Sequence, residues 1–352
     1  MRIQNVATIF LLFLAACSFM PAPTPTPEPR KLTITGWTGY MPQELLDAFS
    51  AETGIAVEYI GYDTPEEVLA AWEQGAAYDL VIIGNQFISG LVSDKKIASI
   101  NYANIPNARN LSANFRDLAF DPGNRYSVVY QWGTTGLLIR TDLLERPIMR
   151  WSDLWDPALD GKILLWPIPR DAVSVLLKSL GFSVNTTNPA HLATALERAP
   201  DFARRLGWVG EGVDTVTQYL VSGEYAVALG WTYDALDAQR QSNNIAYILP
   251  GEGTILWVDC FVLPATSTRQ ALAEQFIDFF LRPEMSALVT NQLGVATAND
   301  AARPLIDTAL RNNQAIFPEL AVLQRAELEM PLDPVTQARY DEIWNVFRAA
   351  QP

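Results

Sequence analysis

Histidine and cysteine are scarce in this chain, which has one histidine and two cysteines among 352 residues. Cys17 lies in the N-terminal segment, so Cys260 has no intramolecular partner, and a structural disulfide or a Cys/His zinc site is excluded. The sequence contains no Walker A loop, no His-Glu-x-x-His motif and no Gly-x-Ser-x-Gly motif. His191 falls early in an amphipathic helical pattern, where we expect a satisfied or solvated side chain. We therefore predict no enzymatic activity, no metal site and no cofactor.

Positive charge is scarce as well, because 25 Lys and Arg stand against 39 Asp and Glu, which gives a net charge of −14. Nucleic-acid binding needs a basic face, so we expect no nucleic-acid partner. An acidic chain suits a cationic ligand, although acidity also serves solubility. With 49% hydrophobic residues, the chain is long enough for more than one core, and we expect two domains.

Long hydrophobic runs are missing too. The apolar stretch at residues 7–17 is too short to cross a bilayer comfortably, since a spanning helix takes ~20 residues. It follows Arg2 and predicts a signal peptide over residues 1–16. Its end, LAAC at residues 14–17, resembles a lipobox, which predicts lipidation of Cys17 and a stable membrane anchor. An ordinary signal peptide and an uncut anchor remain open alternatives.

Prolines recur through residues 17–30, where they fix φ and remove backbone donors. We expect an extended tether there, between the lipid anchor and the globular body. The protein is therefore expected outside the cytoplasm, in the periplasm or at the cell surface, held at the membrane as a lipoprotein.

From residue 31 onward, strand and helix patterns alternate, which is typical of an α/β fold. A turn-rich break at 120–126 precedes an extended segment at 126–140, whose Gly-Thr-Thr-Gly sequence indicates a bend or a close approach. We interpret that segment as a crossing between two lobes. The predicted strands are 31–37, 55–62, 78–84, 225–231, 244–250 and 253–264, and the predicted helices are 42–54, 64–75, 172–181, 191–207, 269–294 (one or two helices) and 340–350.

Aromatic and acidic side chains stand at strand ends, which is where open parallel sheets bind ligands. Trp37, Thr38 and Tyr40 directly follow the first strand. In the strand at 253–264, alternation puts Trp257 and Asp259 on one face. A carboxylate in an apolar strand needs a partner, and a tryptophan two residues away offers a π face to the same cation.

The second half of the chain has similar features. Trp231 ends a strand, Asp234 follows it, and Asp171 begins a helix. Each candidate also has a structural alternative: loop packing for the aromatics, a distant Arg or a backbone N–H for Asp259, and helix capping or the helix dipole for the other two acids. Taken together, the residues suit a cleft around an apolar chain that carries positive charges, and they do not suit an anion site.

At these residues the sequence resembles the spermidine/putrescine-binding proteins of bacterial ABC importers. The resemblance runs over roughly residues 31–348 and is dense in GWTGYMPQELLDAFSAETGI, WSDLWDPALDGKILL and EGTILWVDCFVLP. It implies a type II periplasmic-binding-protein fold, in which two lobes, each a mixed sheet flanked by helices, enclose a ligand cleft. The implied lobes are residues 31–136 plus 256–300 for lobe I and residues 137–255 plus 301–352 for lobe II.

The resemblance also implies which residues bind ligand, with aromatics boxing a methylene chain and carboxylates receiving amines. Acids expected in the family are replaced by Gly39 and Ile168, and tyrosines by Gln86 and Val295. The implied ligand-binding residues are Trp37, Thr38, Tyr40, Asp171, Trp231, Trp257 and Asp259, and the further candidates are Gln86, Asp63, Asp234 and Glu329, the last in place of an amide.

The resemblance thus predicts a monomeric, lipid-anchored solute-binding protein that captures a polyamine and delivers it to the permease subunits of an ABC transporter. Since an unpaired buried ammonium is costly, the two missing acids favour putrescine or a less charged amine over spermidine. A different small solute on the same fold, or a sensing role in which the protein docks on a receptor, remains an alternative.

Overall fold

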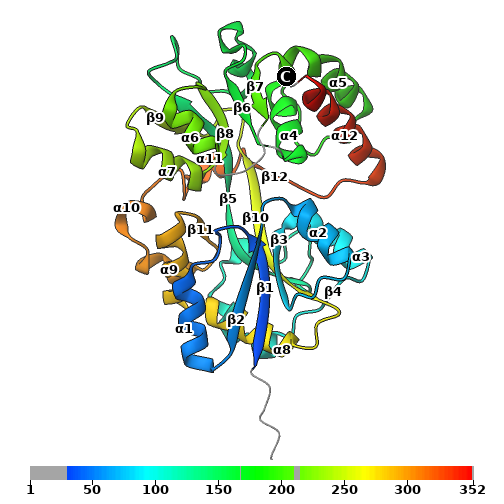
Figure 1. Ribbon diagram of the computed structural model, residues 1–352, viewed down its shortest axis with the longest axis vertical. Coiled ribbons are helices and arrows are strands. Elements are labelled where there is room, and N and C mark those ends of the chain that lie inside the picture. The colour runs from blue at the N-terminus through cyan, green and yellow to red at the C-terminus, as the bar shows by residue number, and fades with distance from the viewer. Residues whose placement is uncertain (1–29, 167, 210–214, 351–352) are drawn as a thin grey trace, which may run out of the picture.

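Two long antiparallel strands join the halves of the molecule in the computed structural model, which describes residues 30–166, 168–209 and 215–350. They are β5 (Ser127–Arg140) and β10 (Ile255–Pro264), which pair from Ile255 opposite Thr135 to Val262 opposite Ser127. Figure 1 shows both strands running along the long axis from a lower lobe to an upper lobe. The predicted crossing at 126–140 is therefore β5.

The lower lobe, lobe I, surrounds a mixed sheet with the strand order β2-β1-β3-β10-β5. β1 is parallel to β2 and β3, whereas β10 is antiparallel to β3. The predicted N-cap of α2 is present, with the Thr64 side chain accepting from the Glu67 backbone. Besides β5 and β10, the main elements of lobe I are β1 (Lys31–Trp37), β2 (Ala56–Tyr62), β3 (Leu80–Gly84), α1 (Gln43–Thr53), α2 (Pro65–Glu73), α3 (Asn85–Ser93), α8 (Gln270–Phe280) and α9 (Pro283–Leu293).

The upper lobe, lobe II, continues the sheet in the order β5-β8-β6-β7, and β9 also pairs with β5. Helices α4, α5 and α12 gather at the right of Figure 1, whereas α6 and α7 lie at the left. Among the described residues, no helix combines the length and the hydropathy that crossing a bilayer requires. The elements are β6 (Ile163–Leu165), β7 (Leu206–Val209), β8 (Val227–Trp231), β9 (Ile245–Ile248), α4 (Pro169–Ser179), α5 (Pro189–Ala203), α6 (Thr215–Ser222), α7 (Thr232–Gln241) and α12 (Pro334–Ala349).

Short elements connect these parts of the chain. The strands are β4 (Ile97–Ala98), β11 (Ala296–Thr297) and β12 (Glu327–Leu328), and the short helices are α10 (Thr308–Arg311) and α11 (Leu320–Leu323). Single 3-10 turns span Tyr102–Asn104, Pro106–Asn110, Ala113–Phe115, Trp151–Trp155, Pro157–Leu159 and Asp300–Leu305.

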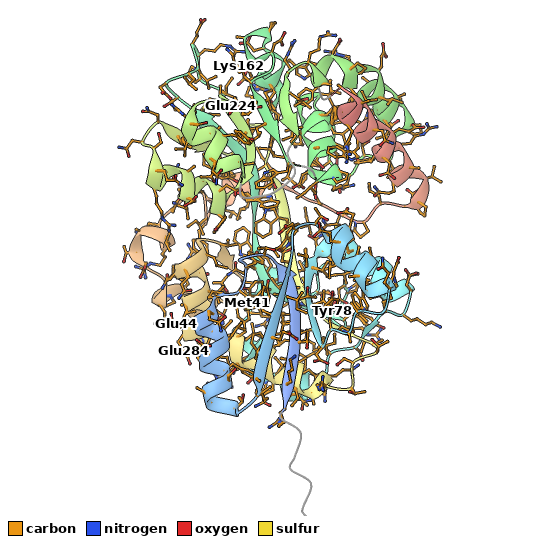
Figure 2. All side chains as sticks on the ribbon, viewed as in Figure 1. Met41, Glu44, Tyr78, Lys162, Glu224 and Glu284 are labelled. Carbon is orange, nitrogen blue, oxygen red and sulfur yellow. The ribbon has the colours of Figure 1, made fainter. Side chains whose placement is uncertain are left out.

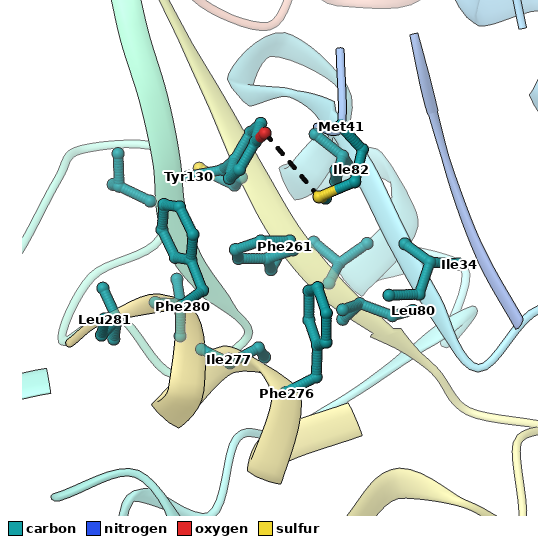
Figure 3. Close-up of a cluster of buried hydrophobic side chains, with 14 of the residues drawn as sticks. Ile34, Met41, Leu80, Ile82, Tyr130, Phe261, Phe276, Ile277, Phe280 and Leu281 are labelled. Atoms are coloured by element: carbon teal, nitrogen blue, oxygen red, sulfur yellow. Dashed lines mark hydrogen bonds between the residues drawn. The ribbon is translucent and has the colours of Figure 1, made fainter. Parts of the chain in front are cut away.

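Each lobe has its own hydrophobic core. In lobe I, Phe261 of β10 packs on Tyr130 of β5, with ring centroids 4.9 Å apart, and on Phe276 and Phe280 of α8 (Figure 3). The lobe II core includes the fully buried Trp166. Figure 2 shows side chains filling both lobes, with labelled positions as far apart as Lys162 above and Glu284 below. One mixed sheet thus runs through both lobes, and each lobe has a separate hydrophobic core, which confirms the predicted two-lobe α/β fold.

The boundaries of the lobes stay a prediction. Ile306, Ile316 and Phe317 lie in the lobe I core, whereas Trp344 and Phe347 of α12 lie in the lobe II core. The core membership of these residues favours a return of the chain to lobe II around β12, whereas the sequence predicts that lobe II resumes at residue 301.

Residues 327–330, which we call the strap, lie against β10 near the middle of the molecule (Figure 1). The Glu327 and Glu329 backbone N–H groups donate to the carbonyls of Thr254 and Leu256, at 3.0 and 3.1 Å. Asn85 fixes the strap from lobe I: its Nδ2 donates to the Glu329 carbonyl at 2.5 Å, and its Oδ1 accepts from a β10 backbone N–H. The strap is thereby held in register with β10.

The Gly-Thr-Thr-Gly sequence does not interrupt β5, which is one continuous strand. A Cβ at Gly133 would collide with the indole of Trp257. This glycine therefore permits the close approach of Trp257, which was one of the two expectations for this sequence, the other being a bend. A register shift opposite Asp259 and Cys260 leaves Tyr130 as the extra residue of a β-bulge. Bulges redirect neighbouring side chains, and this one lies next to the predicted acid.

Candidate functional site

A cavity of about 300 Å³ lies where lobe I, lobe II and the strap meet. Lobe I contributes the turn after β1 and the middle of β10, lobe II contributes the starts of α4 and α7, and the strap contributes Glu329. The sequence-predicted residues that line it are Trp37, Thr38, Tyr40, Gln86, Asp171, Trp231, Asp234, Trp257, Asp259 and Glu329.

Two predicted residues are not brought to the cavity. Asp63 is exposed between β2 and α2, and its backbone N–H donates to Glu67 Oε2 at 3.0 Å, so it belongs to the helix cap and does not line the cavity. Cys17, the predicted lipidation site, lies outside the described residues. His191 is satisfied as expected, since its Nδ1 lies 3.0 Å from Thr186 Oγ1 and its ring stacks on Phe182.

The positions where the sequence departs from the polyamine-binding pattern all line the cavity. Ile168 and Val295 are buried apolar side chains, and Gly39 adopts a left-handed backbone, with φ of 73°. The Gln86 amide folds over Gly84. The sequence did not single out Pro65, Gly84 and Leu293 as lining residues. Tyr233, which the sequence places with Trp231 and Asp234 at the end of a predicted strand, also lines the cavity.

Tryptophans from both lobes form the aromatic part of the wall. Trp231 of lobe II meets Trp37 of lobe I edge to face, with ring centroids 5.8 Å apart, and lies 6.4 Å from Trp257. Trp166 also stacks on Trp231, with ring centroids 4.9 Å apart and an interplanar angle of 15°. Such rings offer apolar faces to methylene groups and π faces to cations. The sequence did not predict Trp166, because its place behind Trp231 depends on the pairing of β6 with β8.

Asp259 is the acid of lobe I, and it is only 7% exposed. Burial raises the pKa of its carboxyl to about 7, although the nearby Tyr40 hydroxyl and Trp37 side chain lower it in part. Burial, and then the charge of Asp259, raises the pKa of the neighbouring Tyr59 and Tyr62 hydroxyls. In the part of the chain that the structure describes, Asp259 forms no ion pair, so the predicted alternative of a distant Arg partner is not found.

Asp171 is the matching acid of lobe II, in the first turn of α4 as predicted. It is 7% exposed, and its carboxylate forms no ion pair or hydrogen bond within the described residues. Burial raises the pKa of its carboxyl well above the usual range, the charge of Glu329 raises it further, and Arg170 offsets part of this. The helix N-terminus favours a carboxylate there, but it supplies no full positive charge.

The other two acids are engaged within the protein. Asp234 Oδ2 accepts from the Trp231 backbone N–H at 2.9 Å, which is the helix-capping role anticipated as its alternative. Glu329 is 2% exposed, accepts from Ser174 Oγ at 2.7 Å and lies 3.6 Å from Arg170 Nε. The described residues hold no group of side chains able to bind a metal ion. Two acids of the cavity, one on each lobe, thus lack a basic partner.

Comparison with known proteins shows the family. The model of the family described as bacterial extracellular solute-binding protein matches residues 44–318. The spermidine/putrescine-binding periplasmic protein of Salmonella typhimurium is 29% identical over 318 residues, which covers 90% of each chain. The putrescine/cadaverine-binding protein of Pseudomonas aeruginosa is 27% identical over 349 residues and covers 95% of this chain and 98% of its own. A solved structure from Listeria monocytogenes, described as a putative spermidine/putrescine ABC transporter, matches with a TM-score of 0.85 at 29% identity, over 91% of this chain and 99% of that one.

These relatives are solute-binding transport proteins and not enzymes, and they confirm the resemblance to the spermidine/putrescine-binding proteins of ABC importers. Residues 44–318 are well over half of the sequence, and the chain therefore belongs to the family of bacterial extracellular solute-binding proteins.

Proposed function

We propose that the protein captures a linear diamine in the cavity between its lobes and delivers it to an ABC transporter. The observation that carries this proposal is the pair Asp171 and Asp259, two buried carboxylates without a basic partner among the described residues, on opposite lobes of one cavity. Burying an unpaired carboxylate is costly, and a ligand ammonium at each one would remove that cost. A diamine that bridges the two acids would also hold the lobes together.

The aromatic wall fits the rest of such a ligand. Trp37, Trp231 and Trp257 would cover the methylene chain and offer π faces to its charged ends. The names of the relatives agree with this chemistry, since they are described as binding spermidine, putrescine or cadaverine. The description of the Listeria monocytogenes structure as an ABC transporter supports permease subunits as the partners.

Lipid anchoring at Cys17 after removal of residues 1–16, with residues 17–30 as the tether, belongs to the same proposal. The support for it is the sequence LAAC at residues 14–17 and the prolines that follow. The relatives that are described as periplasmic or extracellular support a location outside the cytoplasm.

The lining of the cavity favours a diamine over a triamine. Gly39 and Ile168 line the cavity at positions where the family is expected to have acids, and neither offers a negative charge to a third ammonium. An ammonium buried without a partner costs several kcal/mol, which lowers affinity by orders of magnitude. Because Asp234 and Glu329 are engaged within the protein, Asp171 and Asp259 are left for two positive charges, whereas spermidine carries three.

Calorimetric titration of the purified protein tests this proposal. Putrescine is expected to bind at least about tenfold more tightly than spermidine, because only the triamine buries an unmatched charge. Spermidine binding more tightly would contradict the diamine assignment. If neither amine binds while a neutral or anionic solute does, the proposed function is lost altogether.

A further inference from the structure

We propose that Arg170, which does not line the cavity, determines ligand charge by occupying Glu329 as an internal counter-cation. Since Asp234 caps α7, only Asp171 and Asp259 of the four cavity acids are then left for the ligand. This inference rests on the proposed function and adds to it a specificity-determining residue. It requires that Arg170 be fixed beside Glu329, that Glu329 face the cavity, and that the remaining acids be free of basic partners.

Arg170 is held in place by contacts other than Glu329. Its side chain is 11% exposed, and its Nη2 donates to Asn185 Oδ1 at 2.8 Å and to the Met330 carbonyl at 3.3 Å. Its guanidinium also lies over the Tyr340 ring, 5.0 Å from the centroid. These contacts tie Arg170 to lobe II and to the strap. Its Nε lies 3.6 Å from Glu329 Oε1, close enough for strong attraction in a buried place.

Glu329 is fixed even more firmly. Its backbone N–H donates to Leu256 of β10, its carbonyl accepts from Asn85 of lobe I, and its carboxylate accepts from Ser174 of lobe II. With 2% of its surface exposed, the side chain cannot swing out to solvent without breaking the Ser174 bond and the ion pair. Glu329 is therefore a carboxylate at the cavity wall whose charge is matched from inside the protein.

The consequence for a ligand follows from the positions of the charges. An ammonium placed against Glu329 would also approach the Arg170 guanidinium, so the attraction would be offset by repulsion at similar distance. Asp171 and Asp259 form no ion pair within the described residues. The Arg170 charge also acts on Asp171, but the Glu329 charge acts on it more strongly and with opposite sign, so an ammonium at Asp171 meets no net repulsion from this pair. The Arg170–Glu329 pair thus removes one acid from the set available to ligands, and the cavity matches a dication.

The test compares spermidine and putrescine affinities by calorimetry in Arg170 variants at pH 8. In Arg170→Gln, Glu329 loses its counter-cation, and we expect spermidine affinity relative to putrescine to rise at least about tenfold. Arg170→Lys retains the charge, so this ratio should stay within about threefold of wild type. In the double variant Arg170→Gln with Glu329→Gln, the carboxylate is also gone, and the ratio should return toward the wild-type value.

A folded Arg170→Gln variant with an unchanged ratio would overturn the inference, and so would a rise that persists in the double variant. Because Arg170→Gln could fail to fold, Glu329→Gln is a second test. It leaves the guanidinium uncompensated beside the cavity, and we expect putrescine affinity to fall at least about tenfold, whereas unchanged affinity would overturn the inference. Failure of the proposed function is separate, since it would appear as no amine binding to the wild-type protein.

Discussion

Asp259→Asn is expected to weaken putrescine binding at pH 8 by at least about 100-fold, because removal of one partner of a buried ion pair costs about 3 kcal/mol or more. Asparagine has nearly the shape of aspartate but cannot balance an ammonium charge. Asp259 is 7% exposed at the cavity wall and has no basic partner among the described residues, so the ligand would be its counter-ion. Calorimetric titration of the variant measures the loss.

Asp63→Asn is the matched control for that experiment. Asp63 was a candidate from the sequence, yet it is exposed and lies outside the cavity. The same change of aspartate to asparagine there should leave putrescine affinity within about twofold of wild type, since an exposed charge outside the cavity is screened by solvent and salt. Equal losses in both variants would mean that overall charge, and not the buried carboxylate, controls binding.

The unliganded Asp259→Asn variant separates a ligand-binding role from a structural one. Burial raises the pKa of Asp259 from 3.8 to about 7, so the folded protein binds more protons than the unfolded chain between these pH values. Its contribution to stability therefore falls as pH rises through this window and stays low above about pH 7. Asparagine avoids this loss, and the variant should melt at or above the wild-type temperature at pH 8. A melting point several degrees lower would indicate that Asp259 supports the fold.

Putrescine affinity is expected to fall at least about tenfold between pH 8 and pH 6. Binding requires the ionised form of Asp259, and the fraction in that form drops about tenfold across this range when the pKa is near 7. The raised pKa of Asp171 acts in the same direction. The ligand amines stay protonated throughout, since their pKa values are close to that of lysine.

Calorimetry in buffers of different ionisation enthalpy checks this pH dependence. At pH 7 the amine should displace protons from the carboxyls, and the observed heat should therefore depend on the buffer. The Asp63→Asn control should follow the wild-type pH profile. A flat affinity from pH 6 to pH 8 without proton release would mean that the acids of the cavity are already ionised, or that they do not face the ligand.

The aromatic and acidic residues of lobe I that line the cavity could be predicted from the sequence, because short local patterns determine where they lie. The first strand and the capped helix at Thr64 are encoded by short patterns, and these put Trp37 at the end of a parallel strand. The alternation in β10 likewise predicts that Trp257 and Asp259 share a face, and both line the cavity. Residues whose placement depends on one strand or one helix cap were therefore found directly.

The rest of the site depends on contacts between distant parts of the chain. Trp166 reaches Trp231 only because β6 pairs with β8, and the bulge beside Asp259 arises from the register between β5 and β10. The Arg170–Glu329 pair joins residues that a linear pattern does not associate. The same limit explains Asp63, which has the right chemistry but belongs to a helix cap outside the cavity.

The central claim is that one ligand bridges a carboxylate on each lobe, and titration with two amines of equal chain length tests it most directly. Putrescine and n-butylamine share a four-carbon chain and differ in the second ammonium, which would meet the second acid. If Asp171 and Asp259 both receive ligand charge, putrescine should bind the wild-type protein at least about 100-fold more tightly at pH 8. Equal affinities for the two amines would contradict the account, because only one acid would then be engaged.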